Sequence, residues 1–237
     1  MENTGAIYAG SWKGNERFGV GRQVWRDGTV YEGEWCDNLP DGKGRFALAN
    51  GDEYIGEWKK GFACGVGVFQ SHDGTTYEGT WMRHLQHGYG VERSEGGRAT
   101  YAGSFRNGVK EGPGSSKWDT GASYHGCWSG NQCHGFGCFF DASGENAYRG
   151  HWNRGAMDGF GIFSWAGGRT YEGEYRMDEK HGFGVFTWDD GKSYKGFWRQ
   201  GKQDGQGRYY VRSPGPYKTG TWSNGRRTKW LVGGILQ

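Results

Sequence analysis

The sequence predicts an all-β protein, an elongated single-layer antiparallel sheet (a solenoid) of about ten stacked β-hairpins. Three observations lead to this fold class. A Tyr-x-Gly-x-aromatic pattern recurs every 23 or 24 residues along the 237-residue chain, and Gly-x-Gly follows each of its first nine copies. Glycine is unusually frequent, at 49 residues, while only 34% of the residues are hydrophobic. Aromatic residues make up 17% of the chain, so rings are expected to supply most of the buried surface.

Each copy of the repeat begins with a tyrosine and reaches its aromatic partner four positions later. Nine copies are complete, and a final half copy lacks Gly-x-Gly and contains Thr219 as an insertion. Residues 1–225 are therefore expected to form a single repeat array, and residues 226–237 a C-terminal edge or tail. The copies begin at Tyr8, Tyr31, Tyr54, Tyr77, Tyr101, Tyr124, Tyr148, Tyr171, Tyr194 and Tyr217.

The repeat reads as a hairpin because its apolar residues alternate. In the segment 31–35, a period of two places Tyr31, Gly33 and Trp35 on one face of a strand and two glutamates on the other. A second strand in each copy, such as 161–165, carries aromatics on the same face as its leading glycine. Asp-Gly or Asn-Gly pairs, as at 27–28 and 50–51, predict a type I turn closed by a left-handed glycine in a three-residue loop.

The Tyr-x-Gly-x-Trp, Asn/Lys-Gly and Gly-x-Gly columns, in copies such as YEGEWCDNLPDGKG and YEGEYRMDEKHGFG, resemble the membrane occupation and recognition nexus (MORN) repeat. The resemblance covers nearly the whole chain and implies a twisted sheet of stacked hairpins. It also implies roles in scaffolding, in linking membrane to cytoskeleton, in ciliary radial-spoke assemblies, or beside kinase or methyltransferase domains. The departures are modest: Phe105 and Tyr175 replace Trp, and Pro113 lies inside a Gly-x-Gly.

Composition limits the cellular setting. No stretch approaches the roughly 20 apolar residues of a membrane span, and the N-terminus has neither the basic nor the apolar region of a secretion signal. The five cysteines form no disulfide-like framework, which favours reduced thiols. The sequence therefore predicts a cytoplasmic protein, and the MORN resemblance implies association with the cytoskeleton, a cilium or axoneme, or the inner membrane surface.

The face opposite the tyrosine column is the first candidate binding surface. It is polar in the early copies and becomes apolar later, and an apolar stripe on a one-layer sheet needs a partner, a dimer mate or sheet curvature to cover it. A partner helix lying along this face is one occupant; strong twist that shields the stripe internally is the alternative. The predicted protein-binding residues are Val66, Val68, Tyr89, Val91, Phe136, Phe160, Ile162, Phe183 and Val185.

The C-terminal region is the second candidate surface because it is strongly basic. Nine basic residues and one acid lie between positions 195 and 229, interleaved with aromatics, and such a charged end suits anionic lipid headgroups or acidic protein tails. A merely solvated end is the alternative, and nucleic acid is disfavoured because no recognition motif accompanies the charge. The predicted lipid-binding residues are Lys195, Arg199, Lys202, Arg208, Arg212, Lys218, Arg226, Arg227 and Lys229.

Catalysis, metal and cofactors are not expected. No nucleophile-and-base pair or phosphate loop is evident, since none of the Gly-x-Gly pairs joins a strand to a helix. Cys127 and Cys138 are expected opposite one another with histidines nearby, but His134 sits at a recurring loop position, which argues against zinc.

The sequence thus predicts a non-enzymatic scaffold or adaptor for protein-protein interactions, in a cytoskeletal, ciliary or membrane-associated assembly. The alternative is a peripheral membrane protein that binds anionic phospholipids through its basic end. A homodimer formed through one end of the sheet is also expected, because the apolar C-terminal segment 230–236 suits pairing with a second copy or packing back on the sheet.

Overall fold

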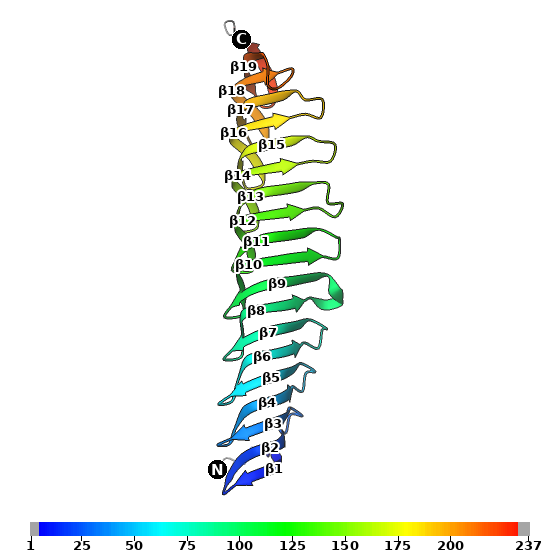
Figure 1. Cartoon of the computed structure of the whole chain (residues 1–237), viewed down its shortest axis with the longest axis vertical. Coiled ribbons are helices and arrows are strands. Elements are labelled where there is room, and N and C mark those ends of the chain that lie inside the picture. The colour runs from blue at the N-terminus through cyan, green and yellow to red at the C-terminus, as the bar shows by residue number, and fades with distance from the viewer. Residues whose placement is uncertain (1–4, 232–237) are drawn as a thin grey trace. The chain divides into compact units, whose positions relative to one another are not determined.

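The computed structural model describes residues 5–231 and confirms the all-β prediction. The chain divides into two compact units, Met1–Asp119 and Thr120–Gln237. Each unit is a single-layer antiparallel sheet in which consecutive strands pair in chain order (Figure 1). Among residues 5–231, no helix is long and apolar enough to cross a membrane.

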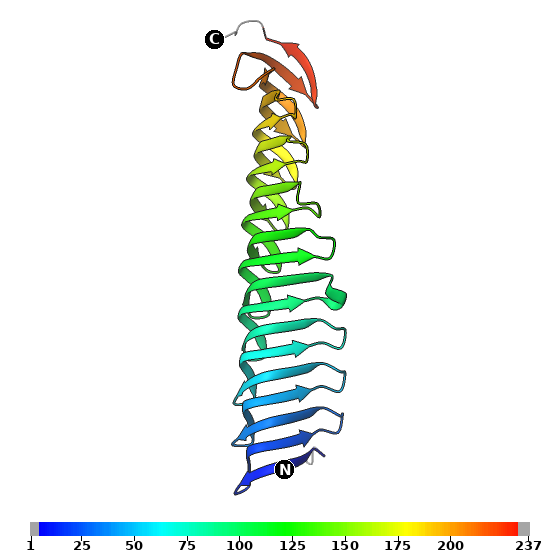
Figure 2. The same cartoon turned by 45° about the vertical axis from the view of Figure 1, so that its right-hand side comes forward.

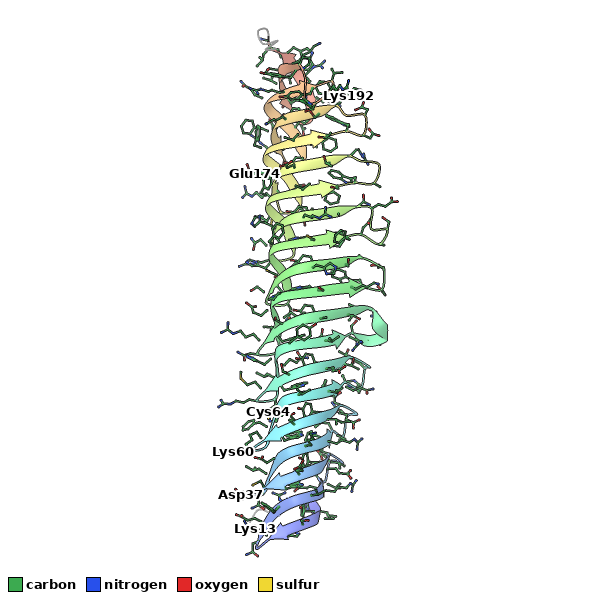
Figure 3. The ribbon with its side chains drawn as sticks, viewed as in Figure 1. Lys13, Asp37, Lys60, Cys64, Glu174 and Lys192 are labelled. Atoms are coloured by element: carbon green, nitrogen blue, oxygen red, sulfur yellow. The ribbon has the colours of Figure 1, made fainter. Side chains whose placement is uncertain are left out.

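Unit 1 contains five hairpins and one short 3-10 turn, η1 (Glu95–Gly97), which accommodates the longer connection after the fourth copy. Asp37 and Lys60, in the loops of two successive hairpins, lie along the same edge of this unit (Figure 3). Its strands are β1 (Ile7–Lys13), β2 (Glu16–Val24), β3 (Val30–Cys36), β4 (Leu39–Ala47), β5 (Glu53–Lys59), β6 (Phe62–Gln70), β7 (Thr76–Met82), β8 (Leu85–Arg93), β9 (Ala99–Arg106) and β10 (Val109–Trp118).

Unit 2 repeats the arrangement and ends in a hairpin that includes the shorter strand β20 (Figure 2). Its strands are β11 (Ser123–Ser129), β12 (Gln132–Phe140), β13 (Ala147–Asn153), β14 (Ala156–Ser164), β15 (Thr170–Arg176), β16 (Glu179–Thr187), β17 (Ser193–Arg199), β18 (Lys202–Tyr210), β19 (Tyr217–Ser223) and β20 (Arg226–Trp230).

The leading tyrosines of the second to ninth copies are buried, each over a pair of glycines. Gly33 and Gly44 face each other across β3 and β4, and the ring of Tyr31 lies over them. A Cβ atom on Gly44 would lie 2.5 Å from Cζ of Tyr31, so the ring occupies the space that a side chain would need. The Tyr31 hydroxyl donates a hydrogen bond to the Glu34 carbonyl (2.9 Å), which satisfies a polar group inside the sheet's core.

The tyrosines and tryptophans form a continuous ladder on one face of each unit, here called the aromatic face. Tyr31 packs edge-on against Trp35 of its own copy (5.0 Å between ring centroids) and Trp58 of the next (5.3 Å). The Trp58 indole N–H donates to the carbonyl of Gly44 in the preceding copy (3.2 Å). Each copy therefore packs and hydrogen-bonds against the next one, and the stability of the array accumulates from copy to copy.

The two glycines of Gly-x-Gly serve different purposes. Gly42 adopts a left-handed φ of 113° at a bulge, between paired residues Gly33/Gly44 and Trp35/Pro40, while Gly44 makes room for the tyrosine ring. The predicted three-residue loops are confirmed: the Trp25 N–H donates to the Thr29 carbonyl, the Gly28 N–H donates to the Trp25 carbonyl, and Gly28 has a φ of 93°.

The last copy departs from the predicted register. The sequence places Tyr217 in the tyrosine column, but Tyr217 lies opposite Tyr210, and Lys218 takes the column position opposite Tyr209. The missing ring is replaced by Trp230, which lies opposite Gly220 and packs edge-on against Trp222 (5.9 Å). Strand β20 thus closes the aromatic face within unit 2; residues 232–237 of the predicted apolar end lie outside the described residues.

Candidate binding groove on the aromatic face of unit 1

An open groove of about 700 Å³ lies on the aromatic face of unit 1 and crosses the second, third and fourth copies. Its walls are almost wholly apolar, and aromatic rings dominate them. We call it the aromatic groove. The side chains that line it include Trp25, Pro40, Phe46, Leu48, Glu53, Tyr54, Trp58, Ala63, Phe69, Trp81, His84 and Gln86.

The groove exists because one column of the repeat carries short side chains here. Pro40 lies opposite Trp35, and Ala63 lies opposite Trp58, at the ninth position after the leading tyrosine of each copy. The same position holds a long side chain elsewhere: Arg17 in the first copy, Lys110 in the fifth. Short residues leave free space here, and the groove lies over the buried rings of Tyr54 and Trp58 and beside half-buried rings such as Phe46 and Trp81.

Basic side chains bound the groove at both ends. The Arg17 guanidinium lies 4.5 Å from the centroid of the Trp35 ring. The Lys110 ammonium lies 4.8 Å from the Tyr101 ring and forms an ion pair with Glu92 at 2.8 Å. Wherever this column carries a cation in unit 1, the cation therefore rests on an aromatic ring, an arrangement favoured by the negative face of the ring.

Contacts between copies hold the rim of the groove, and they differ beside Ala63 and beside Pro40. The Ala63 N–H donates to Nδ1 of His84 in the next loop (3.3 Å). Desolvation lowers the pKa of His84, which favours the neutral ring that this contact needs. Pro40 has no N–H, and the equivalent loop position is Gly61, which has no side chain. Beside Pro40 the copies are joined by the backbone alone, through the Gly61 N–H that donates to the Pro40 carbonyl (2.8 Å), and no side chain of that loop position lies over the groove.

The predicted protein-binding residues lie on the opposite, outer face of each unit. Most are exposed, including Val66 at 60% and Tyr89 at 64%, whereas Val91 and Val185 are half-buried. Within unit 1, Glu78 lies across from both Val68 and Val91. Within unit 2, charged residues also interrupt the apolar side chains, which include Phe136, Phe160, Ile162 and Phe183.

The glutamate beside Phe160 shows how the interruption arises. Glu174 lies opposite Phe160, and its Oε1 accepts a hydrogen bond from the Phe183 backbone N–H (3.2 Å). Glu174 directly follows the bulge after Gly173, and this hydrogen bond holds its carboxylate between the exposed side chains of Phe160 and Phe183. The outer face thus offers several exposed apolar side chains that are separated by charged ones.

The predicted lipid-binding residues do not share one face. Lys195 and Arg208 pair across β17 and β18 on the outer face, whereas the ammonium of Lys218 and the guanidinium of Arg227 lie over the Trp230 ring at 5.8 and 4.2 Å. Arg199 ends β17 and Lys202 begins β18, while the others lie in a loop or on the short last strand. Arg199 forms an ion pair with Asp204 at 3.4 Å. The exposed ones include Lys202, Arg208, Arg212, Lys218, Arg226, Arg227 and Lys229.

One smaller hollow joins members of both predicted sets. It measures about 350 Å³ on the outer face of unit 2 and is lined by Phe183, Phe197, Lys195 and Arg208. The two phenylalanines pack edge-on at 5.6 Å, and the Lys195 ammonium lies 6.0 Å from the Phe183 ring. Aromatic walls with two cations suit a ligand that has both apolar and anionic parts.

The cysteine and histidine cluster is arranged differently from the sequence prediction. Cys138 lies opposite His125, and Cys133 lies opposite Trp128, because a bulge follows Gly126 and shifts Cys127 out of register. Within residues 5–231, no group of three or more His, Cys, Asp or Glu side chains could hold a metal ion.

The repeat units of the fold match one protein family. The model of the MORN repeat matches nine consecutive segments: residues 8–30, 31–53, 54–76, 77–97, 101–123, 124–145, 148–168, 171–193 and 194–211. The chain belongs to the MORN repeat family. The resemblance read from the sequence is thereby confirmed, and each matched segment begins at a tyrosine of the buried column.

Two solved structures are similar to this MORN repeat chain. One is the TCP10 domain of Danio rerio CPAP in complex with a peptide of Danio rerio STIL, at 12% identity and a TM-score of 0.40, with 91% of this chain and 83% of that chain covered. The other is the SAS-4 (dCPAP) TCP domain of Drosophila melanogaster in complex with a proline-rich motif of Ana2 (dSTIL), at 9% identity and a TM-score of 0.41, with 67% and 86% covered. A search of the curated proteins found no match.

The aromatic groove was missed when the sequence was read as a MORN repeat array. The tyrosine and tryptophan columns predict buried packing, and the apolar stripe predicts a binding surface on the opposite face. The available signal was the ninth position of each copy, where Pro40 and Ala63 stand among Arg17, Lys110 and Met157. Short side chains in one column of a repeat indicate where the ladder is uncovered.

Proposed function

We propose that this MORN repeat protein is a non-enzymatic adaptor that binds a segment of another protein in the aromatic groove. The observation that carries the proposal is a preformed, open groove of about 700 Å³ with rings as its walls. Grooves of this kind anchor protein partners because rigid aromatic surface is desolvated at little cost in conformational entropy.

The hydrogen bonds of the ladder support a preformed site. The Trp58 and Trp81 indoles are both held by N–H bonds to glycine carbonyls, at 3.2 and 3.1 Å. Their rings also pack edge-on against Tyr54, at 5.3 and 5.1 Å. A partner that enters the groove therefore meets rings already fixed in place, which reduces the entropy lost on binding.

The setting of this adaptor is proposed from the family resemblance. A scaffold in a cytoskeletal, ciliary or membrane-associated assembly is consistent with a chain built from repeats that present long surfaces. The exposed side chains of the outer face, such as Val66 and Phe160, remain a predicted second protein-binding surface.

Binding of a selected peptide tests the groove directly. Peptides would be selected by display against the full chain and then measured against Ala63→Met, which fills the groove with the side chain that Met157 places at the equivalent position. We expect the affinity to fall at least ten-fold, because the methionine takes up space in the groove beside Trp58. The matched control is Val66→Thr on the outer face, which should leave the affinity unchanged. Selected peptides that bind Ala63→Met as tightly as the parent would refute the proposal.

Phospholipid binding is a second candidate function, favoured by the hollow that joins Phe183 and Phe197 to Lys195 and Arg208. We expect sedimentation with phosphoinositide-containing vesicles, but not neutral ones, at about 0.05 M salt, and several-fold less at about 0.3 M, where charges are more strongly screened. Lys195→Glu and Arg208→Glu should reduce it further, whereas Lys13→Glu in unit 1 should not. Sedimentation that is insensitive to salt and to these charges would exclude this surface.

A further inference from the structure

We infer that the aromatic groove takes up a lysine side chain of the partner protein, in a cage formed by Trp25, Tyr31, Phe46 and Trp58. The inference rests on the proposed function, since it names the chemistry of the partner at the same groove. It is drawn from the protein itself: an equivalent cage in unit 2 is already filled by a lysine of this chain.

That lysine is Lys180, whose ammonium lies among four aromatic rings. Nζ is 5.2 Å from the centroid of the Trp165 ring, 5.6 Å from Tyr171, 5.0 Å from Phe186 and 5.1 Å from Trp198. Lys180 forms no ion pair with any carboxylate of residues 5–231. The rings are therefore its principal electrostatic partners.

Burial in this cage has a cost that the rings must offset. Desolvation, the larger effect, and the charge of Arg169 both lower the pKa of Lys180. An ammonium that is largely removed from water without a carboxylate partner is held by the negative faces of the surrounding rings and by packing of its alkyl stem. The cage of unit 2 thus shows what four rings in this register accommodate.

The cage of unit 1 has the same composition and nearly the same ring spacings. Each of its rings lies 140 positions before its counterpart, and Pro40 lies 140 positions before Lys180. The ring centroids of Trp25 and Phe46 are 5.9 Å apart, and those of Trp165 and Phe186 are 5.7 Å apart. The Phe46–Trp58 distance is 5.7 Å, against 6.2 Å for Phe186–Trp198. The Tyr31–Trp58 distance is 5.3 Å, against 5.2 Å for Tyr171–Trp198.

The residue at the centre is what differs. Pro40 carries a short uncharged ring, so the place taken by the Lys180 stem and ammonium in unit 2 stays part of the open groove in unit 1. Tyr31 is fully buried and forms the floor, while Trp25, Phe46 and Trp58 line the opening. Gly61 has no side chain at the loop position that His84 occupies in the next copy, so nothing from this loop covers the groove beside Pro40.

Net charge favours the same partner. Unit 1 has 14 Lys and Arg against 16 Asp and Glu, a formal charge of −2, whereas unit 2 has 15 against 10, a formal charge of +5. A basic segment is therefore drawn to unit 1 rather than to unit 2. The cage then recognises the ammonium, and the neighbouring rings Phe69 and Trp81 contact the apolar part of the segment.

Two small probes, the second of which lacks the terminal ammonium group of the first, test this inference on the full chain. N-acetyl-lysine methylamide and N-acetyl-norleucine methylamide would be titrated while the tryptophan indole N–H signals are followed by NMR. We expect the signals of Trp25 and Trp58 to shift, with an apparent Kd roughly five-fold or more lower for the lysine probe, as cation–π attraction at a partly desolvated site implies.

Two variants exploit the equivalence of the cages. Pro40→Lys should fill the cage of unit 1 and abolish the shifts of Trp25 and Trp58, and a thermal unfolding scan would show that it folds. Lys180→Ala should open the cage of unit 2, so that the lysine probe also shifts Trp165 and Trp198. The second variant keeps the inference testable even if Pro40→Lys fails to fold.

Several results would overturn the inference. Equal affinity for the norleucine probe would show that the groove binds apolar side chains without regard to charge. Tighter binding of phosphocholine than of the lysine probe would assign the cage to a lipid headgroup. Failure of Lys180→Ala to gain a lysine-dependent site would break the equivalence. None of these outcomes contradicts the proposed function, which is refuted only if selected peptides bind Ala63→Met as tightly as the parent.

Discussion

Gly44→Ala is expected to destabilise unit 1 by about 3 kcal/mol, the upper part of the range for overpacking a closely packed core. The new Cβ would lie 2.5 Å from Cζ of Tyr31. Tyr31 is 0% exposed and is held edge-on by Trp35 and Trp58, so the ring cannot move aside without disturbing two copies. Urea unfolding followed by tryptophan fluorescence measures the loss.

Gly74→Ala is the matched control for this substitution. Gly74 has a φ of +89° but nothing within 4 Å of an added Cβ, so only backbone strain of about 1–2 kcal/mol is expected. Gly44 has no positive φ, so a loss at Gly44 that exceeds the loss at Gly74 is due to the contact with the tyrosine ring and not to backbone strain. If Gly44→Ala cost no more than Gly74→Ala, the account of the glycine pair as the seat of the ring would be wrong.

The protein is expected to unfold cooperatively between about pH 10 and pH 12. Burial, helped by the Glu92 carboxylate, raises the pKa of Tyr77 and Tyr101 to about 12, and burial with Asp204 does the same for Tyr194. The pKa values of the other column tyrosines, such as Tyr31 and Tyr171, are raised as well.

The sign follows from proton binding. Unfolded tyrosine ionises near pH 10, so between about pH 10 and 12 the folded state holds more protons than the unfolded state. The stabilisation is complete below pH 10 and is lost as the pH rises toward the folded pKa. Absorbance at 295 nm and near-ultraviolet circular dichroism should therefore change together, and Tyr101→Phe should make the dependence on pH less steep. Gradual, independent ionisation with the circular dichroism unchanged would contradict the burial.

The sheet was predictable from sequence because each copy repeats the same local instructions. The alternation in 31–35 assigns the faces, and Asp27-Gly28 sets a loop whose length keeps the following Tyr31 on the same face. The final copy was not predictable. An insertion near Thr219 leaves two registers open, and only the packing of Trp230 opposite Gly220 decides between them.

The groove escaped prediction for a different reason. The rings of Trp58 and Trp81 suffice to explain the fold, so nothing about their own positions distinguishes a covered ring from an accessible one. The free space beside the rings depends on the side chain across the strand pair, and there Ala63 is short where Lys180 is long. The ninth position after the leading tyrosine follows no pattern in the repeat, yet its side chain determines where the groove forms.

The face contacted by a bound peptide tests the central claim most directly. A display-selected peptide added to the isotopically labelled full chain should give intermolecular NMR contacts to the indole protons of Trp25, Trp58 and Trp81, with the outer-face methyl groups of Val66 and Val68 unaffected. Contacts to Val66, Val68 and Tyr89, with the indole signals unchanged, would contradict the account and move the binding surface to the outer face.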